Sequence, residues 1–503
     1  MGTSLHAAYV AAKPEILIGL FGLAVLLFDF LLDKADKYLN AVLALLGLGF
    51  GALALMQLGF TAQGHGIFRF LHLRFDPPDY LGFNGSYALD AFSIVTSLVI
   101  VLATALVVLL SVKYLEIEDA NVGEYYALLL FAAVGMMFMV SGADLIVLFL
   151  ALEVMALCEY VLAGFLRGSR RSNEAAVKFF LLGAFSSGLL LYGMSLLYGI
   201  GGSTKLSVIA QRLSHRAGDP LSWVALITLL AGMYFKIAAV PFHQWTPDAY
   251  EGAPTSITAF ISVAPKVASF AFIIRILFKG LWPLHLEWQA LTIGVAIATM
   301  TVGNLAAITQ TNIKRFFGYS TIAHVGYLLL GLVAAAEGNG NEDGVGAIVI
   351  YLIVYAFMNL GAFAVFIMMR RKDLIGDEID DLSGLMARAP GMAILMLIFL
   401  LSLAGIPPTA GFIGKYYIFL SLIETGHYYL AVLGVGYAVV ALYYYFRIVV
   451  VMFMKRPLDE VPLATSFALR VALGVTLAAT LLIGVFPQRI IVIAREAVRP
   501  FFS

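Results

Sequence analysis

The chain has 503 residues, of which 62% are apolar and only 12% are Asp, Glu, Lys or Arg, and it carries no formal net charge. A water-soluble fold cannot bury so much apolar surface, so the composition indicates a membrane protein. The neutral balance argues against nucleic acid or an acidic lipid surface as a partner. The single cysteine, Cys158, lies in an apolar stretch, which excludes a disulfide framework and a cysteine-ligated metal or iron–sulfur cluster.

In chain order, long apolar runs predict about fourteen transmembrane helices of roughly 20 residues, the length that crosses a hydrocarbon core of about 30 Å. The first run, Pro14 to Leu32, is expected to be a retained helix because it lacks the basic segment and cleavage site of a signal peptide. The segment around Val208 fits either a short interfacial helix or an ordered loop. The helices are expected to be centred near Leu23, Leu48, Leu98, Phe131, Met155, Leu189, Leu229, Ile273, Ala298, Leu328, Val354, Phe399, Leu442 and Ala478.

Lys and Arg occur mainly in the odd-numbered connections between the predicted helices. Those connections contain Lys34, Lys37, Lys113, Arg167, Arg170, Arg171, Lys314, Arg315, Arg370, Arg371, Lys372, Arg388, Lys455 and Arg456. The even-numbered connections contain Arg69, Arg74, Lys205, Arg212, Arg216 and Lys279. The positive-inside rule therefore places the odd connections in the cytoplasm and both termini outside. No connection is long enough for a soluble catalytic domain, so function is expected within the membrane.

Four ionisable residues lie deep within the predicted spans, where a bilayer penalises a charge by several kcal/mol. Glu153 follows Asp144 by nine residues, which places it roughly 13 Å into its helix. Lys236, Lys266 and Lys415 lie in three later spans. Glu153 is the expected counter-ion of Lys236. Alternating carboxylate and amine groups suit proton transfer, while the alternative is a buried ion pair that only fixes helix packing.

Each of these lysines lies close to proline, which cannot donate a backbone hydrogen bond. A helix that opens at proline leaves carbonyl groups free to meet water or an ammonium group, as in many transporters. The spans of Lys236 and Lys415 should also run in opposite directions, because four spans separate them, and an inverted repeat would give that arrangement. The helix breaks are expected at Pro241, Pro265, Pro407 and Pro408.

Other polar residues in the spans carry weaker signals. His243 and His324 are candidate relay groups, although ordinary interior histidines are an equal alternative. A second group lies nearer the predicted helix ends, where snorkelling or pairing with a loop is expected, and consists of Glu159, Lys178, Arg275 and Arg447. Asp29 and Asp90 are also expected at the ends of spans.

The run from Lys236 to Thr255, KIAAVPFHQWTPDAYEGAPT, closely resembles the signature of the antiporter-like membrane subunits of NADH:quinone oxidoreductase, respiratory complex I. Two further runs, SLAGIPPTAGFIGK at 402–415 and YAFMNLGAF at 355–363, are most similar to the N-type branch of that family. The M-type branch typically has glutamate where this chain has Lys415. The resemblance covers essentially the whole chain.

The resemblance implies an all-α polytopic membrane fold of about fourteen transmembrane helices, with two inverted five-helix repeats that contain broken helices. The implied divisions are three N-terminal helices in 1–112, the first repeat with helices 4–8 in 113–285, the second repeat with helices 9–13 in 286–456, and helix 14 in 457–503.

The resemblance also implies a function. Glu153 and Lys236 would form an ion pair, Lys266 would be the central relay and Lys415 would serve a second half-channel, all joined by water. Quinone reduction elsewhere would drive the protons. NADH, FMN, iron–sulfur clusters and quinone would bind to other subunits and none to this chain. The neighbours would be lipids and subunits resembling K and M, in the bacterial inner membrane with both termini periplasmic.

Three functions remain open at this point. The first is a proton-translocating subunit of complex I, and the second is a subunit of a multisubunit sodium/proton antiporter. The third is a passive membrane scaffold that only holds its neighbours. A sodium requirement for transport would favour the second, and normal pumping after loss of Lys236 would favour the third.

Overall fold

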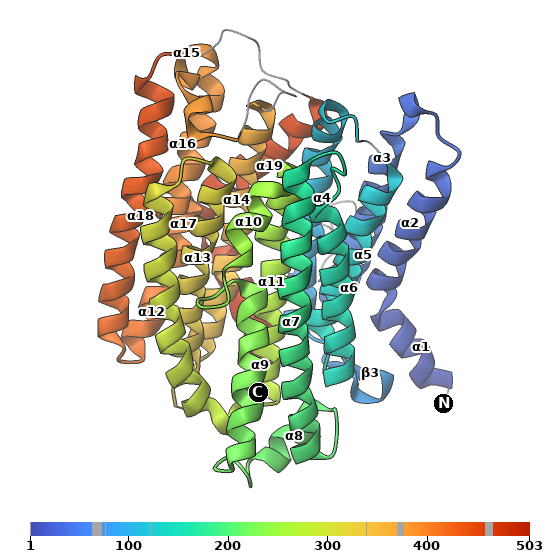
Figure 1. The fold of residues 1–503 in the computed structure, drawn as a ribbon. Coiled ribbons are helices and arrows are strands. Elements are labelled where there is room, and N and C mark those ends of the chain that lie inside the picture. The colour runs from blue at the N-terminus through green and yellow to red at the C-terminus, as the bar shows by residue number, and fades with distance from the viewer. Residues whose placement is uncertain are drawn as a thin grey trace.

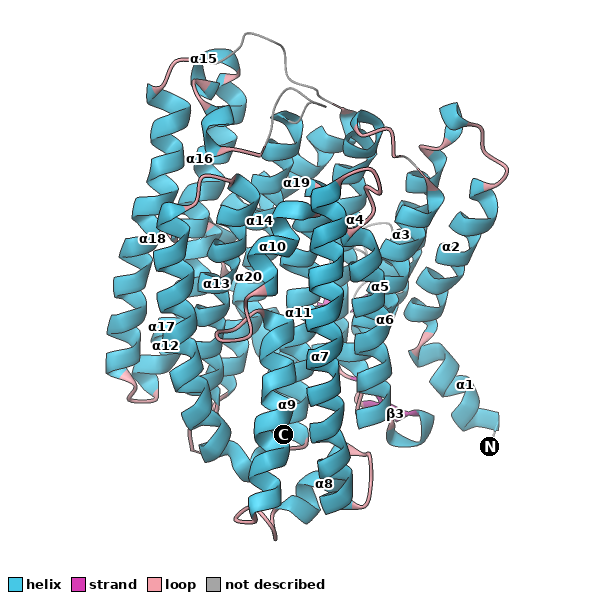
Figure 2. Ribbon diagram, in the orientation of Figure 1, coloured by secondary structure: helices cyan, strands magenta, loops and turns pink. Residues whose placement is uncertain are grey.

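A computed structural model describes residues 2–62, 73–75, 77–120, 122–338, 340–369, 377–457 and 466–502. Over these residues the chain forms a bundle of long helices (Figure 1), with only short strand and loop segments between them (Figure 2). Arg69, Arg370, Arg371 and Lys372, four of the basic residues that bear on orientation, lie outside the described residues.

The N-terminal part begins with α1 (Gly2–Ala11), α2 (Lys13–Asp29), η1 (Lys34–Asp36), α3 (Leu39–Gly59) and α4 (Ala91–Ile117). Proline suits the first turn of α2, because the N–H groups there have no partner within the helix. Two small antiparallel pairs lie between α3 and α4. They are β1 (Phe60–Ala62) with β2 (Leu73–Phe75) and β3 (Tyr80–Gly82) with β4 (Tyr87–Leu89), the latter two joined by η3 (Phe83–Gly85).

The next part consists of α5 (Gly123–Ser141), α6 (Leu145–Ala163), α7 (Arg170–Gly201), α8 (Leu206–Leu213), α9 (Pro220–Ile237), α10 (Trp245–Gly252) and α11 (Thr255–Lys279). The segment around Val208, which fitted two interpretations, is thus the helix α8. It buries Leu206, Ile209 and Leu213 on one side and lies at the lower end of the bundle in Figure 1.

The third part consists of η4 (Trp282–Leu284), α12 (His285–Thr309), α13 (Ile313–Ala335), α14 (Glu342–Met369), η5 (Ile379–Leu382), α15 (Leu385–Arg388), α16 (Pro390–Ala404), α17 (Ala410–Glu424) and α18 (Tyr428–Met454). The chain ends with α19 (Phe467–Val485), α20 (Gln488–Val498) and η6 (Arg499–Phe501). Both α19 and α20 pack along α4 and α14, so together they form one crossing.

Twelve of the described helices are long and apolar enough to cross a membrane. Helix α2 and the pair α16 and α17 supply two further crossings, so the described residues make fourteen, in agreement with the prediction. Besides α19–α20, two crossings are interrupted, α9–α10 and α16–α17, and these two contain Lys236 and Lys415. In Figure 1, α9 rises from α8 at the lower end, whereas α16 descends from α15 at the upper end. The two broken crossings therefore run in opposite directions, as an inverted repeat requires.

Helix α11 lies at the centre of the bundle, and every residue from Thr255 to Phe278 is buried. It does not break at Pro265, which differs from the expectation, and continues through this residue to Lys279. Because α11 is enclosed by other helices on all sides, neighbouring groups can compensate for the missing backbone bond. The outer helices instead expose large apolar side chains, including Leu27, Phe185 and Val432, as a surface in contact with lipid or other subunits does.

Candidate functional site

The first helix break separates α9 from α10. Ala238 has the left-handed φ of 64°, which ends α9, and the Trp245 indole N–H donates to the carbonyl of Phe235 at 2.9 Å. The predicted break residue Pro241 lies in this interruption, two residues before His243. The carbonyl of Lys236, in the last turn of α9, accepts a hydrogen bond from Nζ of Lys266 at 3.2 Å. A break in one helix thus provides the acceptor for a lysine on another.

Lys236 and Lys266 are both interior side chains, with 8% and 1% exposed. Nζ of Lys236 donates to the hydroxyl of Tyr160 on α6 at 3.3 Å. Nζ of Lys266 lies 4.8 Å from the centroid of the Trp245 ring on α10, where the π face attracts a cation. Helices α6, α9, α10 and α11 therefore bring the two lysines together around one carbonyl group.

The second helix break repeats this chemistry. Helix α16 ends at Ala404, and Gly405 has a left-handed φ of 87° that glycine adopts at low cost. A Cβ there would lie 2.8 Å from Cδ of Lys415, so the site also needs the missing side chain. Nζ of Lys415, which is 4% exposed, donates to the carbonyls of Leu403 at 3.2 Å and Ala404 at 2.8 Å. The predicted break residues, Pro407 and Pro408, lie between α16 and α17.

Helix α6 carries two glutamates, and they differ from the expectation. Glu153 is only half-buried and accepts a hydrogen bond from Ser187 of α7 at 2.5 Å. Within the described part of the chain it forms no direct ion pair with Lys236, although its charge still acts on that lysine. Glu159 does not snorkel, because it is 4% exposed and its charge acts on both Lys236 and Lys266. Six residues turn an α-helix by about 600°, so the two carboxylates face different neighbours.

A chain of hydrogen bonds leads from α11 into the second half of the bundle. The Asn359 amide donates to Ser262, which lies one turn before Lys266, at 2.8 Å and to the hydroxyl of Tyr355 at 3.0 Å. Tyr355 in turn lies 2.9 Å from the hydroxyl of Thr321 on α13. The polar groups of α11, α13 and α14 are therefore connected without a charged residue.

The two candidate histidines occupy different surroundings. His324 is 2% exposed, and its ring nitrogens lie 2.6 Å from the Tyr351 hydroxyl and 3.1 Å from the Tyr445 hydroxyl. The charge of Lys415 acts on this ring. His243 is half-buried in the first break, and its buried Nδ1 has no hydrogen-bond partner in the described part of the chain. His324 thus belongs to the surroundings of Lys415, and His243 to those of α10.

The comparisons with known proteins agree with this architecture. Residues 142–441 match the family described as NADH:quinone oxidoreductase/Mrp antiporter, TM. NADH-quinone oxidoreductase subunit N 2 of Solibacter usitatus (strain Ellin6076) is 52% identical over 491 residues, which cover 96% of each chain. The chain belongs to the NADH:quinone oxidoreductase/Mrp antiporter family.

Solved structures with the fold of this antiporter family support the assignment. A chain of respiratory complex I from Thermus thermophilus with bound aureothin is 31% identical, with a TM-score of 0.75 over 95% of this chain and 98% of that chain. A chain of the Mrp complex from Dietzia sp. DQ12-45-1b has a TM-score of 0.78 over 98% of both chains, at 21% identity. The second similarity shows the fold alone.

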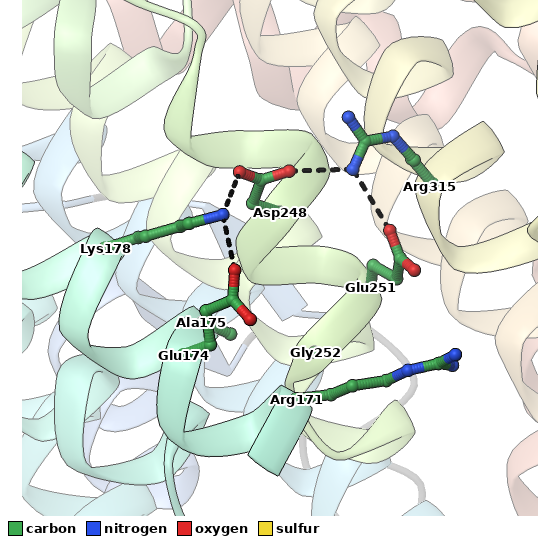
Figure 3. A pocket seen from close by; sticks show the side chains of 8 residues that line it. All are labelled: Arg171, Glu174, Ala175, Lys178, Asp248, Glu251, Gly252 and Arg315. Atoms are coloured by element: carbon green, nitrogen blue, oxygen red, sulfur yellow. Dashed lines mark hydrogen bonds and ion pairs between the residues drawn. The ribbon is translucent and has the colours of Figure 1, made fainter.

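In this antiporter-family chain, an ionic cluster holds α10 against its neighbours (Figure 3). Asp248 of α10 lies 3.0 Å from Nζ of Lys178 on α7 and accepts from Arg315 of α13 at 2.7 Å. Arg315 also donates to Glu251 at 3.0 Å, and Lys178 pairs with Glu174 at 2.8 Å. The cluster borders a cleft of about 240 Å³ lined by Arg171, Glu174, Ala175, Lys178, Asp248, Glu251, Gly252 and Arg315. It ties the half-helix after the first break to both halves of the bundle.

Asp248→Asn is expected to loosen α10 without unfolding the chain. Lys178 and Arg315 are 45% and 32% exposed, so solvent weakens both pairs, and their loss should cost about 1 kcal/mol in total. Backbone amides of α10 should then exchange with deuterium about fivefold faster, while those of α11 stay unchanged. Glu174→Gln is the control, because it removes only the contact within α7. Unchanged exchange in α10 would contradict the assigned role of the cluster.

A second ionic group lies at the other end of α11, away from the lysines. Asp90 caps α4 by accepting from the Ser93 N–H at 2.8 Å, and both of its oxygens accept from the Arg275 guanidinium at 2.9 and 3.0 Å. Nε of Arg275 donates to the carbonyl of Val140 on α5 at 2.8 Å. Asp90 thus lies at a helix end, as expected, but the buried Arg275 does not snorkel and instead joins α4, α5 and α11.

Proposed function

We propose that this chain is the N-type, proton-translocating subunit in the membrane arm of NADH:quinone oxidoreductase, where Glu153, Lys236, Lys266 and Lys415 relay protons. The observation that carries the proposal is the way the lysines are held. In the described part of the chain their ammonium groups contact carbonyls, a hydroxyl and aromatic faces, and no carboxylate lies within ion-pair distance. Neutral acceptors favour the exchange of protons.

The reason is the free-energy cost of the groups that remain when the lysine loses its proton. A lysine in a buried ion pair that loses its proton leaves an uncompensated carboxylate, which costs several kcal/mol in a low-dielectric interior. A lysine held by backbone carbonyls leaves only neutral groups among its hydrogen-bond partners. Lys266 and Lys415 are both held in this way, and Lys236 donates to a hydroxyl. The protonated and neutral forms of each lysine can therefore both be accommodated, as a relay group requires.

The intervening polar groups support transfer between the two halves of the bundle. We propose that His324 and the hydroxyl chain around it connect Lys266 with Lys415, and that His243 exchanges protons at the first break. Buried polar atoms without protein partners are commonly satisfied by water, and His243 Nδ1 and the Tyr327 hydroxyl are such atoms. Water would then complete the path.

The wider assembly follows from the relatives. Because a 52% identical relative is named as a subunit of NADH-quinone oxidoreductase, we propose neighbours resembling subunits K and M, with lipids around the rest of the chain. Quinone reduction in other subunits would supply the driving energy, and NADH, FMN and iron–sulfur clusters would bind there. The basic connections favour periplasmic termini in the bacterial inner membrane. The repeats would span 113–285 and 286–456, between the N-terminal helices of 1–112 and helix 14 in 457–503.

A transport assay separates protons from sodium as the carried ion. The intact complex, reconstituted in proteoliposomes and driven by NADH, is expected to acidify or alkalinise the lumen at the same rate with and without sodium. The relationship to Mrp antiporters makes sodium the second candidate. Sodium-dependent charge movement, with labelled sodium accumulating in step with NADH oxidation, would contradict the proton proposal and support sodium as the carried ion.

A further inference from the structure

Glu159 is the most deeply buried carboxylate in the neighbourhood of the two first-half lysines. Its side chain is 4% exposed, and Oε1 has no hydrogen-bond partner among the residues that the structure describes. The relay outlined above does not use it. A carboxylate that is buried without a partner is costly in a membrane interior, so its presence on α6 requires a physical explanation.

The position of Glu159 relative to the lysines supplies the first part of that explanation. Its neighbour in sequence, Tyr160, accepts the hydrogen bond from Lys236, and the carbonyl of Lys236 accepts from Lys266. The charge of Glu153 acts on Lys236, whereas the charge of Glu159 acts on both Lys236 and Lys266. Glu159 is thus the carboxylate that both lysines share.

The surroundings of Glu159 supply the second part. Within the described residues, several buried polar atoms without hydrogen-bond partners belong to the first break and to the segment that follows it. They are Nδ1 of His243, Oγ1 of Thr246, the hydroxyl of Tyr250 and Oγ1 of Thr255. The charge of Glu159 acts on Tyr250. Since buried polar groups are normally satisfied by protein or by water, this part of the interior suits ordered water that could reach Oε1 of Glu159.

We propose that Glu159 is a proton-carrying residue that exchanges protons with Lys266 and Lys236, which adds a second carboxylate station to the relay. The inference rests on the proton-translocating function proposed above. In the elementary step a proton leaves Nζ of Lys266 and bonds to Oε1 of Glu159, directly or through water. The ammonium becomes an amine and the carboxylate becomes an acid, so the total charge is unchanged.

This step explains why a carboxylate without a hydrogen-bonded partner is tolerated. A carboxylate that served only to fix packing would be expected to have both oxygens satisfied. Glu159 instead balances whichever of two adjacent lysines carries the proton. If both lysines are protonated, Glu159 and Glu153 together neutralise them. Once one proton has moved on, the four groups carry one net negative charge, and transfer of the remaining proton to Glu159 leaves that charge on Glu153 alone until another proton arrives.

The test uses the intact complex in native membrane vesicles, with matched variants. Glu159→Gln keeps the shape and removes the acid, and it is expected to lower the rate of proton uptake per NADH oxidised by about tenfold. Glu159→Asp restores a carboxyl group and should recover part of the rate with a shifted pH profile. The control is Glu116→Gln on α4, a carboxylate with 64% exposure that pairs with Lys113 at 2.7 Å. It should pump like the parent.

An infrared difference spectrum between resting and turning-over complex gives a direct measurement. The carbonyl-stretch band of a protonated carboxylic acid should appear during turnover in the parent and be absent in Glu159→Gln. Normal pumping by Glu159→Gln, beside impaired pumping by Lys266→Met, would overturn the role of Glu159 and leave the proposed function intact. Normal pumping by both would overturn the proposed function. If Glu159→Gln fails to assemble, the spectrum and pH profile of Glu159→Asp decide, and a profile identical to the parent's contradicts the proposal.

Discussion

Lys236→Met is expected to leave the complex assembled and still oxidising NADH, while proton pumping falls by about tenfold or more. Methionine fills much the same space as the buried lysine stem but cannot hold a proton, so packing is preserved while the relay group is lost. The side chain is 8% exposed, and among the described residues its ammonium group donates to the Tyr160 hydroxyl alone, so the change breaks no direct ion pair. The measurement is the number of protons taken up per NADH in sealed vesicles.

Lys236→Arg sharpens this test. Arginine keeps the positive charge but does not lose its proton at any physiological pH, so it should pump as poorly as methionine if exchange is required. If charge alone holds the helices in place, arginine should pump normally. Lys455→Met, which changes an exposed lysine paired with Asp380, is the matched control at the surface. A fully assembled Lys236→Met complex with normal pumping would favour the passive scaffold, and the same design with Glu153→Gln tests the carboxylate whose charge acts on Lys236.

Asp90→Asn is expected to have the largest effect on stability. The Asp90 and Arg275 side chains are 5% and 3% exposed, so the variant leaves a guanidinium buried without its partner. Breaking a buried pair in this way costs about 3–5 kcal/mol. The amount of the chain in the membrane should fall, and the thermal transition of the purified complex should shift downward.

The double variant Asp90→Leu with Arg275→Met tests the reason for that loss. It removes both charges, and well-packed apolar replacements of a buried pair are often neutral in stability. Recovery of the thermal transition in the double variant is the expected result. The exposed pair of Lys455 and Asp380 serves as the control, since its loss should cost less than about 1 kcal/mol. An Asp90→Asn chain as stable as the parent would show that the ion pair does not hold α4 against α11.

The sequence predicts those parts of the fold in which the free-energy cost of placing polar groups in a bilayer restricts the residues that can occur. Apolar runs long enough for a bilayer predict the fourteen crossings, and lysines beside prolines point to the breaks after α9 and α16. Proline alone is a weaker signal, as α11 shows by passing through Pro265. Whether a helix ends at proline depends on what encloses it, and enclosure is a property of the whole bundle.

Glu159 lies near the end of α6, as expected, but it does not snorkel, which illustrates a second limit. Distance along the chain from a predicted loop gives an approximate depth, but it does not give the face of the helix on which a residue lies. Glu159 follows Glu153 by six residues, and this spacing indicates that the two carboxylates lie on different faces of the helix and have different neighbours.

The polar chain of the second half was beyond sequence reasoning for another reason. In the sequence, three tyrosines resemble apolar core residues, namely Tyr351, Tyr355 and Tyr445. Only the structure shows that their hydroxyl groups lie within hydrogen-bond distance of His324, Thr321 and Asn359. Neutral hydrogen-bonding residues are inexpensive in a helix interior and so leave little trace in an apolar sequence.

The opposed directions of α9 and α16 have an electrical consequence. Each ends at a break with its carbonyl groups turned toward a lysine, and each carboxyl end carries roughly half a negative elementary charge from the aligned peptide dipoles. Because one half-helix points up and the other down, their dipoles oppose each other along the membrane normal (Figure 1). The electric field of a membrane potential therefore acts on the dipoles of α9 and α16 in opposite senses. Its work is done on the migrating protons rather than on these two helices.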